Sequence, residues 1–373
     1  MASGLTDSLG ALRCPLSGEP LHLLAAAELA VLRDELAAGS WLHSDGSEVS
    51  SPLTAALRAE TSPIVYRVED EIACLMPSLA IQPAAKAAGM SLPEEKRQVQ
   101  EFYDSFGWLK AADGVFNDTA VFTDRRTRAR AYQLRCNERI GRHLDRGRFL
   151  LDVASGPIPH SEYLEFSRNY ERRVCVDFSI RALREARSRL GDRGVYILGD
   201  ITCLPLADNA MDAIISLHTV YHLARGEQAR AIAELHRVAR PGAPIVVVYV
   251  WSTSPLMNFF SAVRRLARGL KRTSTIGRRA VPAPTAPAQE SAVPSLFFCP
   301  QDYSWYRSEI APRFPGRLAV WSAVSSEFQS RFFSDSALGR VLSRLIPLCE
   351  DALPGWCGRF GQYPMFLFKK QGS

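Results

Sequence analysis

The sequence predicts an α/β protein built on a doubly wound, mostly parallel sheet. Short apolar segments alternate with amphipathic ones between residues 149 and 251, which is the pattern of repeated strand–helix–strand units. Residues 149–154 form a buried strand that breaks into a turn of small residues, and 174–177 and 195–198 are the next two strands. Because parallel strands end at one edge of a sheet, the polar residues behind these three strands should meet there.

The rest of the chain supplies further elements of the same kind. Arg240, Pro241 and Gly242 form a stop signal for a helix. The apolar run after that signal favours a central strand. In chain order, the expected elements are a strand at 211–217, a helix at 226–239, a strand at 244–251, a strand at 317–328, a helix at 338–353 and a strand at 363–369.

Acidic residues follow the first three strands in a spacing that suits a nucleoside. Gly156 and its small neighbours let the backbone approach a ligand, and a helix expected from residue 161 would offer free N–H groups. Asp177 lies 25 residues past Asp152, where a carboxylate can accept from both hydroxyls of a ribose. Asp200 ends the third strand, whereas Pro157 stands where a second glycine of a dinucleotide motif could sit.

These stretches, LLDVASGPIPH, VCVDFS, GDITCLPLADNAMDAIIS, LHTVYHL and ELHRVARPGAPIVVVY, resemble the class I S-adenosylmethionine (SAM) dependent methyltransferases. The similarity is to the subgroup that includes the ubiquinone and menaquinone biosynthesis enzymes, and it is specific over residues 132–251. It implies a seven-stranded Rossmann-like sheet whose last strand lies antiparallel between strands five and six. It also implies SAM as the cofactor.

The resemblance implies a role for each residue at the strand ends. The backbone N–H groups of residues 152–157 would face the methionine carboxylate, Asp177 would hold the ribose, and Asp200 would accept from the adenine amino group. For any single acid, a turn or helix-capping role is the alternative. The implied cofactor residues are Asp152, Ala154, Ser155, Gly156, Pro157, Asp177, Phe178, Asp200, Ile201, Leu217 and His218.

Two histidines are candidates for a general base. Methyl transfer from a sulfonium needs mainly in-line positioning, and some enzymes add a base that deprotonates the acceptor. His218, at the end of the fourth strand, is the first candidate, and His222, in VYHL, is the second. For His218 the alternative is a pocket-lining or hydrogen-bonding role, and for His222 it is a structural role.

Residues 1–85 form a small α+β module. Its segments LRCP, LHSDG and IVYRVEDEIACLMP resemble the small zinc-ribbon-like activators of tRNA and protein methyltransferases. Residues 64–68 and 72–76 should form a hairpin. No metal site is expected, because Cys14 is followed by Ser17 and Cys74 stands alone. The module has two interpretations. It either packs on the catalytic domain and stabilises it, or it helps to form the substrate mouth or binds a partner.

Residues 86–131 connect the module to the catalytic domain. The helix expected at 94–110 carries Tyr103, Phe106 and Trp108. The resemblance implies that they are lid residues over the cofactor, and the alternative is that they are ordinary core residues. The polar segment 116–130 is expected to be a loop at the mouth, and a helix at 132–144 then leads into the first strand.

The catalytic domain, 132–373, contains an insertion at 252–315. Its first helix, 256–271, is apolar on one side and is followed by basic residues. It is either an interfacial helix that contacts a membrane surface through 256–272 or a solvated basic edge. The resemblance implies that Tyr303 and Trp305 lie beside the acceptor pocket. The Pro/Ala-rich segment 281–294 should be flexible.

Composition narrows the functional classes. Lys and Arg together number 45 against 39 acids, a net charge of +6 that is not a strong nucleic-acid signature. Eight scattered cysteines without a C-x-x-C pair favour reduced thiols in a cytoplasmic compartment. No secretory signal and no apolar run long enough to span a membrane is recognised.

The sequence therefore predicts a cytoplasmic SAM-dependent methyltransferase acting on oxygen, nitrogen or carbon of a small-molecule or lipid-linked acceptor. Specialised or cell-envelope metabolism is the expected setting. Two alternatives stay open: an RNA or protein methyltransferase, and a SAM-binding protein with other chemistry.

Overall fold

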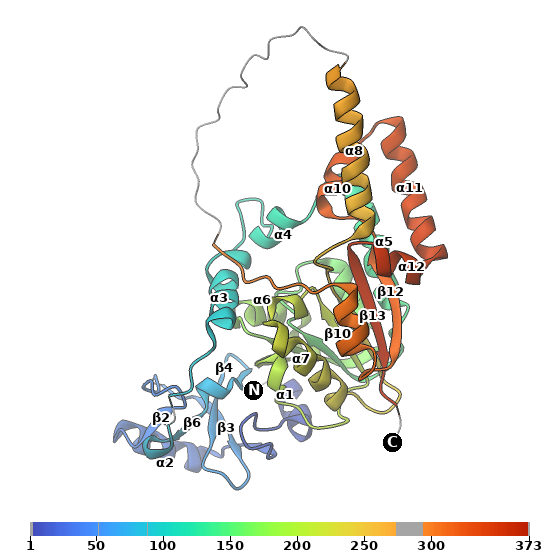
Figure 1. Ribbon diagram of the computed structural model, residues 1–373. Coiled ribbons are helices and arrows are strands. Elements are labelled where there is room, and N and C mark those ends of the chain that lie inside the picture. The colour runs from blue at the N-terminus through green and yellow to red at the C-terminus, as the bar shows by residue number, and fades with distance from the viewer. Residues whose placement is uncertain (1–2, 51, 88, 274–293, 372–373) are drawn as a thin grey trace, which may run out of the picture.

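The computed structural model describes residues 3–50, 52–87, 89–273 and 294–371, with side chains omitted for 266–273. Its centre is a twisted sheet with helices on both faces (Figure 1). The seven central strands are β7 (Gly147–Val153), β8 (Tyr170–Asp177), β9 (Gly194–Leu198), β10 (Ala213–Leu217), β11 (Pro244–Val248), β12 (Gly316–Ser322) and β13 (Tyr363–Lys369).

The strand order β9-β8-β7-β10-β11-β13-β12 confirms the predicted sheet. The first five strands pair in parallel, and β13 lies antiparallel between β11 and β12. Successive residues of a strand enter separate apolar clusters on the two faces: Leu150 and Ile215 lie in one cluster, and Leu151 and Ile214 in the other. A sheet that is buried on both faces explains why these strands are apolar throughout.

Helices cover both faces, and the insertion adds a long helix at one end. The α-helices described after residue 126 are α5 (Thr127–Gly141), α6 (Ile180–Leu190), α7 (Arg225–Val238), α8 (Pro255–Thr273), α9 (Tyr303–Trp305), α10 (Ser326–Phe332), α11 (Ala337–Ala352) and α12 (Pro354–Phe360). In the described part of the chain, no helix combines the length and apolarity needed to cross a bilayer. Most of the segment expected to be flexible, 281–294, lies outside the described residues.

The N-terminal residues extend the same sheet. Their elements are α1 (Ser3–Ser8), β1 (Leu21–Leu23), α2 (Ala26–Ala37), β2 (Trp41–His43), β3 (Ala55–Ala59), β4 (Val65–Glu69), β5 (Ile72–Cys74) and β6 (Ile81–Pro83). The predicted hairpin is β4 and β5, and β5 also pairs in parallel with β9, with Ile72 opposite Tyr196. The module therefore covers the open edge of the central sheet through backbone hydrogen bonds.

Several element predictions were wrong in the type or the extent of the element. The segment 116–130, expected to be a loop, contains α4 (Asn117–Phe122) and the start of α5. The strand expected at 317–328 ends at Ser322, and Ser325 caps α10 through its side chain. The helix expected from residue 161 is a 3-10 helix, η5 (Ser161–Ser167), so the first turn lacks the α-helix N-terminus that we expected.

Candidate functional site

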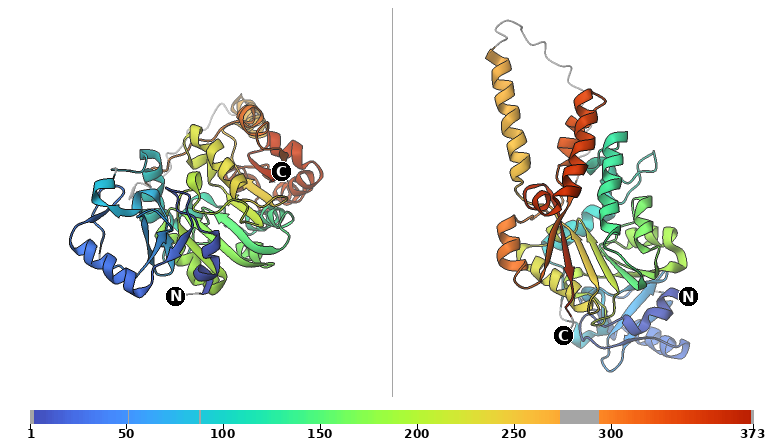
Figure 2. Two further views of the ribbon diagram at one scale, coloured as in Figure 1. Left: turned by 90° about the horizontal axis from the view of Figure 1, so that it is seen from below. Right: turned by 90° about the vertical axis from the view of Figure 1, so that its right-hand side faces the viewer.

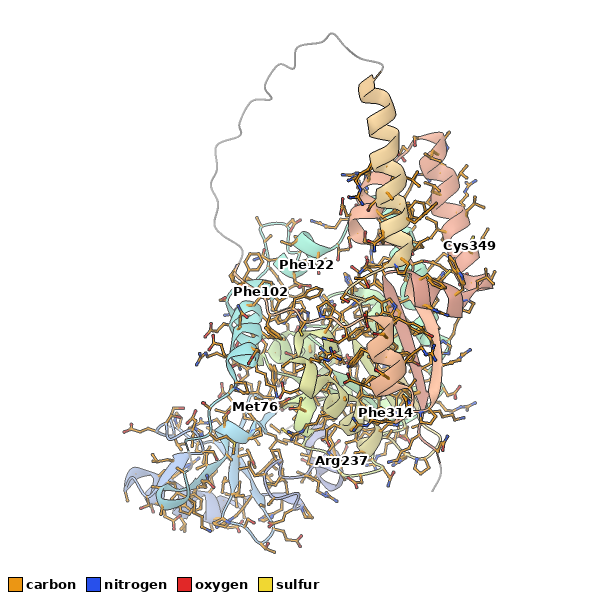
Figure 3. All side chains as sticks on the ribbon, in the orientation of Figure 1. Met76, Phe102, Phe122, Arg237, Phe314 and Cys349 are labelled. Atoms are coloured by element: carbon orange, nitrogen blue, oxygen red, sulfur yellow. The ribbon has the colours of Figure 1, made fainter. Side chains whose placement is uncertain are left out.

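A cavity of about 590 Å³ opens at the carboxyl ends of the central strands. Its floor is formed by the turns after β7, β8, β9 and β10, and its cover by α3 (Glu94–Phe102), the π-helical turn Tyr103–Gly107 and α4. Figure 3 labels Phe102 and Phe122 on this cover. The cavity is strongly aromatic, with Phe102, Tyr103, Trp108, Phe122, Tyr132, Tyr163, Phe178, Tyr221, Phe298, Trp321 and Tyr363 among its lining residues.

The turn after β7 is tight and uses its own backbone donors internally. Ala154 and Gly156 have φ angles of 54° and 53°, and only glycine adopts this left-handed region freely. The Ala154 N–H donates to the Val176 carbonyl at 2.7 Å, and the Gly156 N–H donates to Asp177 at 2.8 Å. The expectation that these N–H groups face a ligand carboxylate is therefore wrong. Pro157, also expected in the site, is not among the lining residues.

Asp152 lines the cavity but is already paired. The Arg173 Nε donates to its Oδ2 at 3.0 Å, and both side chains are almost fully buried, at 1% and 4% exposure. Arg173 also donates to the Tyr163 carbonyl. The carboxylate of Asp152 is thus neutralised from within the sheet.

Asp177 lies where the sequence predicted a ribose partner. Its Oδ1 accepts from the Ser179 N–H at 2.9 Å and its Oδ2 from the Gly156 N–H. Each oxygen keeps a lone pair for a further donor. Burial raises the pKa of Asp177 to about 6, although the two N–H groups oppose this rise. Phe178 and Ile201 also line the cavity.

Asp200 does not line the cavity, contrary to expectation. Its Oδ2 lies 2.7 Å from the Nζ of Lys96, and its Oδ1 accepts from the Thr202 N–H and hydroxyl. Lys96 also contacts Glu227 at 2.6 Å. Burial lowers the pKa of Lys96, but the two carboxylates outweigh this effect and raise it above its ordinary value. The ammonium group therefore fastens α3 to the end of β9 and to α7.

The predicted lid residues separate into two groups. Tyr103 stacks on Trp108, with ring centroids 4.8 Å apart, and both line the cavity. A Cβ added at Gly156 would lie 2.9 Å from the Trp108 ring, so Trp108 covers the glycine turn. Phe106 instead packs against Phe102 and does not line the cavity.

The two residues expected beside the acceptor pocket lie elsewhere. Trp305 stacks on Tyr249, with ring centroids 5.5 Å apart, and Tyr303 packs against Trp251. Neither Trp305 nor Tyr303 lines the cavity. The insertion reaches the cavity through Leu296 and Phe298 instead.

Three histidines line the cavity, two predicted and one not. His218 follows β10 with a φ angle of 60°, and its ring packs edge-on against Trp321 at 4.5 Å. His222 has its Nδ1 2.7 Å from the Phe297 carbonyl, which can only accept, so the Nε2 of the neutral ring is an acceptor. Burial lowers the pKa of His218 to about 3 and those of His222 and His160 to about 4. All three are neutral at pH 7.

Asp118, on α4, is a cavity residue that the sequence did not indicate. Among the described residues, none donates a hydrogen bond to its carboxylate, and burial raises its pKa to about 6. Its charge acts on the hydroxyl groups of Tyr103, Tyr163 and Tyr221. Its segment was expected at the mouth of the site but as a loop, so no helical pattern singled out this acid among its polar neighbours.

The two cysteines of the N-terminal module, Cys14 and Cys74, do not belong to a set of metal ligands within the described part of the chain. Cys14 lies 3.5 Å from the Tyr66 hydroxyl, and Cys74 is buried beside β4. Across the described ranges, no group of three or more His, Cys, Asp or Glu side chains could hold a metal ion.

The fold and the cavity define an α/β protein with a ligand site at the carboxyl edge of a doubly wound sheet. Residues 151–247 match the family described as a methyltransferase domain. A demethylmenaquinone methyltransferase of Renibacterium salmoninarum is 36% identical over 102 residues, which are 27% of this chain and 40% of that protein. One of Roseiflexus is 36% identical over 78 residues, 21% of this chain and 32% of that protein.

The chain thus spans less than half the length of these curated relatives. Among solved structures, the Haemonchus contortus phosphoethanolamine N-methyltransferase 1, in complex with phosphoethanolamine and S-adenosylhomocysteine, aligns with a TM-score of 0.47. It is 14% identical, and the alignment covers 76% of this chain and 50% of that one.

Proposed function

We propose that this protein is a SAM-dependent methyltransferase whose acceptor is a small or lipid-linked molecule with no anionic group at its reacting end. One observation carries the proposal. The segment that matches the methyltransferase domain, 151–247, supplies the turns after β7, β8, β9 and β10 that form the floor of the cavity. The relatives named demethylmenaquinone methyltransferase support a small acceptor.

The residues of the cavity fit SAM. Asp177 has free lone pairs for the two ribose hydroxyls, and Phe178 and Ile201 offer apolar contact to the adenine. Trp108 lines the cavity with a buried indole N–H that has no partner among the described residues. A buried donor without a partner costs about 1–3 kcal/mol, which a carboxylate acceptor would recover. Because the turn's own N–H groups are used internally, Trp108 is the proposed partner of the methionine carboxylate.

The remaining predicted residues complete the assignment. Asp152 would lie beside the methionine ammonium, while Ala154, Ser155 and Gly156 would give close backbone contact. Leu217 and His218 would lie beside the sulfonium. When bound, SAM would supply a methyl group that is already activated for transfer.

We assign the general base to Asp118 in place of His218 or His222. An effective base has a pKa near the working pH, and about 6 for Asp118 is closer than about 3 and about 4 for the two histidines. Asp118 would take the proton of the acceptor on one free carboxylate oxygen. The Nε2 of His222, which keeps its lone pair, would accept a hydrogen bond from the acceptor.

The charge of the lining indicates the acceptor class. Of the described residues that line the cavity, none is lysine or arginine, and the three histidines carry no charge at pH 7. A phosphate or carboxylate close to the reacting atom would find no counter-charge, and burying it unpaired is costly. The aromatic lining favours a flat or hydrocarbon-rich acceptor.

The test is calorimetric titration with SAM and with S-adenosylhomocysteine. Asp177→Ala should weaken binding roughly 10- to 100-fold, because it removes hydrogen bonds to a charged acceptor worth about 1.5–3 kcal/mol. Asp192→Ala, at an exposed position after α6, is the matched control and should bind as the wild type does. Unchanged affinity in Asp177→Ala would contradict the ribose assignment.

Turnover distinguishes the alternatives. Formation of S-adenosylhomocysteine with a neutral small acceptor supports the proposal. Turnover only on RNA or protein, or tight SAM binding without any turnover, would favour one of the two alternatives that the sequence left open.

A further inference from the structure

The outer face of α11 is apolar and exposed. Leu338, Val341, Leu345 and Leu348 are 60%, 50%, 50% and 57% exposed, and their spacing places them along one stripe of the helix. Beyond the end of α11, Leu353 and Trp356 are also more than half exposed. Single exposed apolar residues are ordinary, but a continuous stripe of this length marks an interaction surface.

Helix α8 has the same character and adds positive charge. Phe259 and Val263, one turn apart, are 61% and 46% exposed, while Phe260 on another side packs against Phe328 of α10 at 5.0 Å. Arg265 is exposed, and the sequence of α8 contains five Lys or Arg residues and no acid. On α11, Arg344 is exposed and lies one helical turn from Val341 and from Leu348 of the apolar stripe.

Both helices project from one end of the molecule, away from the N-terminal module (Figures 1 and 2). Phe122 of α4 lines the cavity and is 49% exposed, and its neighbour Val121 is 50% exposed. The Phe122 carbonyl accepts from Ser326 of α10, so α4, α10 and α8 are in contact in turn. A line of contacts therefore runs from α8 through α10 to the cavity mouth, and the exposed Glu327 and Arg331 of α10 lie along it.

We propose that the exposed faces of α8 and α11, with Trp356 and the α4 tip, form a docking surface for an anionic lipid bilayer. Apolar side chains flanked by arginines, with an aromatic residue at the edge, suit the acyl–headgroup boundary of such a membrane. The surface goes beyond methyl transfer and does not depend on it. It would place the cavity mouth at the membrane, where a lipid-linked acceptor enters without crossing water.

Charge argues for a bilayer over a second copy of the chain. Two copies meeting through these faces would bring the arginines of α8 and α11 close to those of the partner. Like charges at an interface oppose association, whereas anionic headgroups neutralise them. The bilayer is therefore the occupant that satisfies both the apolar stripe and the basic residues.

The test is co-sedimentation of the full chain with phosphatidylcholine vesicles, alone and mixed in equal parts with phosphatidylglycerol. We expect the protein to bind the mixed vesicles and to bind them more weakly as salt is added, because the electrostatic screening length falls to about 3 Å at 1 M salt. The double variant Leu345→Glu/Leu348→Glu and the variant Phe259→Glu should each weaken binding about tenfold or more. Val31→Glu is the matched control, since Val31 is 59% exposed on α2 of the N-terminal module.

Each outcome decides the proposal. Loss of binding in the α8 and α11 variants, with retention in Val31→Glu, supports it. A wild-type protein that stays in solution, or glutamate variants that sediment like the wild type, would overturn it. A dimer in sedimentation velocity that Leu345→Glu/Leu348→Glu dissociates would assign the face to a second copy. Titration of the same variants with SAM tests the cofactor site separately, so a loss of vesicle binding can be distinguished from a damaged cofactor site.

Discussion

Lys96→Met tests whether the lid is held to the core by one buried ammonium group. Lys96 lies on α3, which leads into the turn that carries Tyr103 and Trp108 over the cavity. Its Nζ contacts Asp200 of the β9 turn at 2.7 Å and Glu227 of α7 at 2.6 Å. Methionine keeps most of the side-chain volume and removes only the charge and its hydrogen bonds.

The magnitude follows from the burial of the three groups. Lys96 and Asp200 are 5% and 7% exposed, and removing one partner of a fully buried pair costs about 3–5 kcal/mol. Glu227 is 28% exposed and can be solvated, and Asp200 keeps two hydrogen bonds from Thr202. We therefore expect a loss of roughly 2–3 kcal/mol in the free energy of unfolding. Asp200→Asn combined with Lys96→Met should recover part of this loss.

The informative readout is SAM affinity. A less firmly docked α3 should weaken SAM binding roughly fivefold to tenfold, because part of the binding energy then orders the lid. Urea unfolding measures the stability, and calorimetry measures the affinity. Arg97→Met, on the exposed side of the same helix, is the control and should change neither. If Lys96→Met bound SAM more tightly, Lys96 would be competing with the adenine amino group for Asp200, and the lid argument would be refuted.

Three further predictions concern the cavity. Trp108→Phe keeps the stacking on Tyr103 but removes the indole N–H, so the affinity for SAM measured by calorimetry should fall about tenfold. A SAM analogue that lacks the carboxylate should bind the wild type and the variant equally. Asp118→Asn should lower kcat about 100-fold and abolish the fall in rate below about pH 6, since a base with that pKa must be deprotonated. The three cavity histidines, His160, His218 and His222, should make the fold less stable in acid. Their pKa values in the folded protein, about 3 to 4, lie below the ordinary 6.5, so the unfolded chain binds more protons. The free energy of unfolding should therefore fall as the pH drops from 6.5 to 4. Urea midpoints across that range should show a smaller pH dependence in His218→Asn and in His160→Asn; an unchanged slope would contradict the burial argument.

The sheet could be predicted because its signals are local. Each central strand is a short apolar run, and the alternation with amphipathic helices fixes a parallel sheet and the edge at which its turns meet. The positions of Asp152, Asp177 and His218 at the cavity follow directly from that topology. The parallel pairing of β5 with β9 did not follow, because both partners are ordinary apolar strands and their pairing joins residues far apart in the chain.

Residues that act through long-range contacts were harder to predict. Asp200 was placed correctly at a strand end, yet the sequence does not reveal that Lys96 approaches its carboxylate from another helix. A signal was present. Lys96 shares the buried face of α3 with Val99 and Phe102, and a lysine inside the apolar stripe of a helix implies a buried acidic partner.

The other acids that line the cavity already have partners, which supports the proposal that Asp118 is the base. Asp152 is neutralised by Arg173, Asp124 is paired with Arg126, and Asp177 accepts two backbone N–H groups. Each of these acids already has a partner within the protein. Asp118 lines the cavity, and none of the described residues donates a hydrogen bond to its carboxylate. Under the proposed mechanism, a carboxylate that burial makes costly to charge would gain by accepting a proton from a neutral acceptor. An acceptor that brings its own negative charge would be disfavoured in the same cavity.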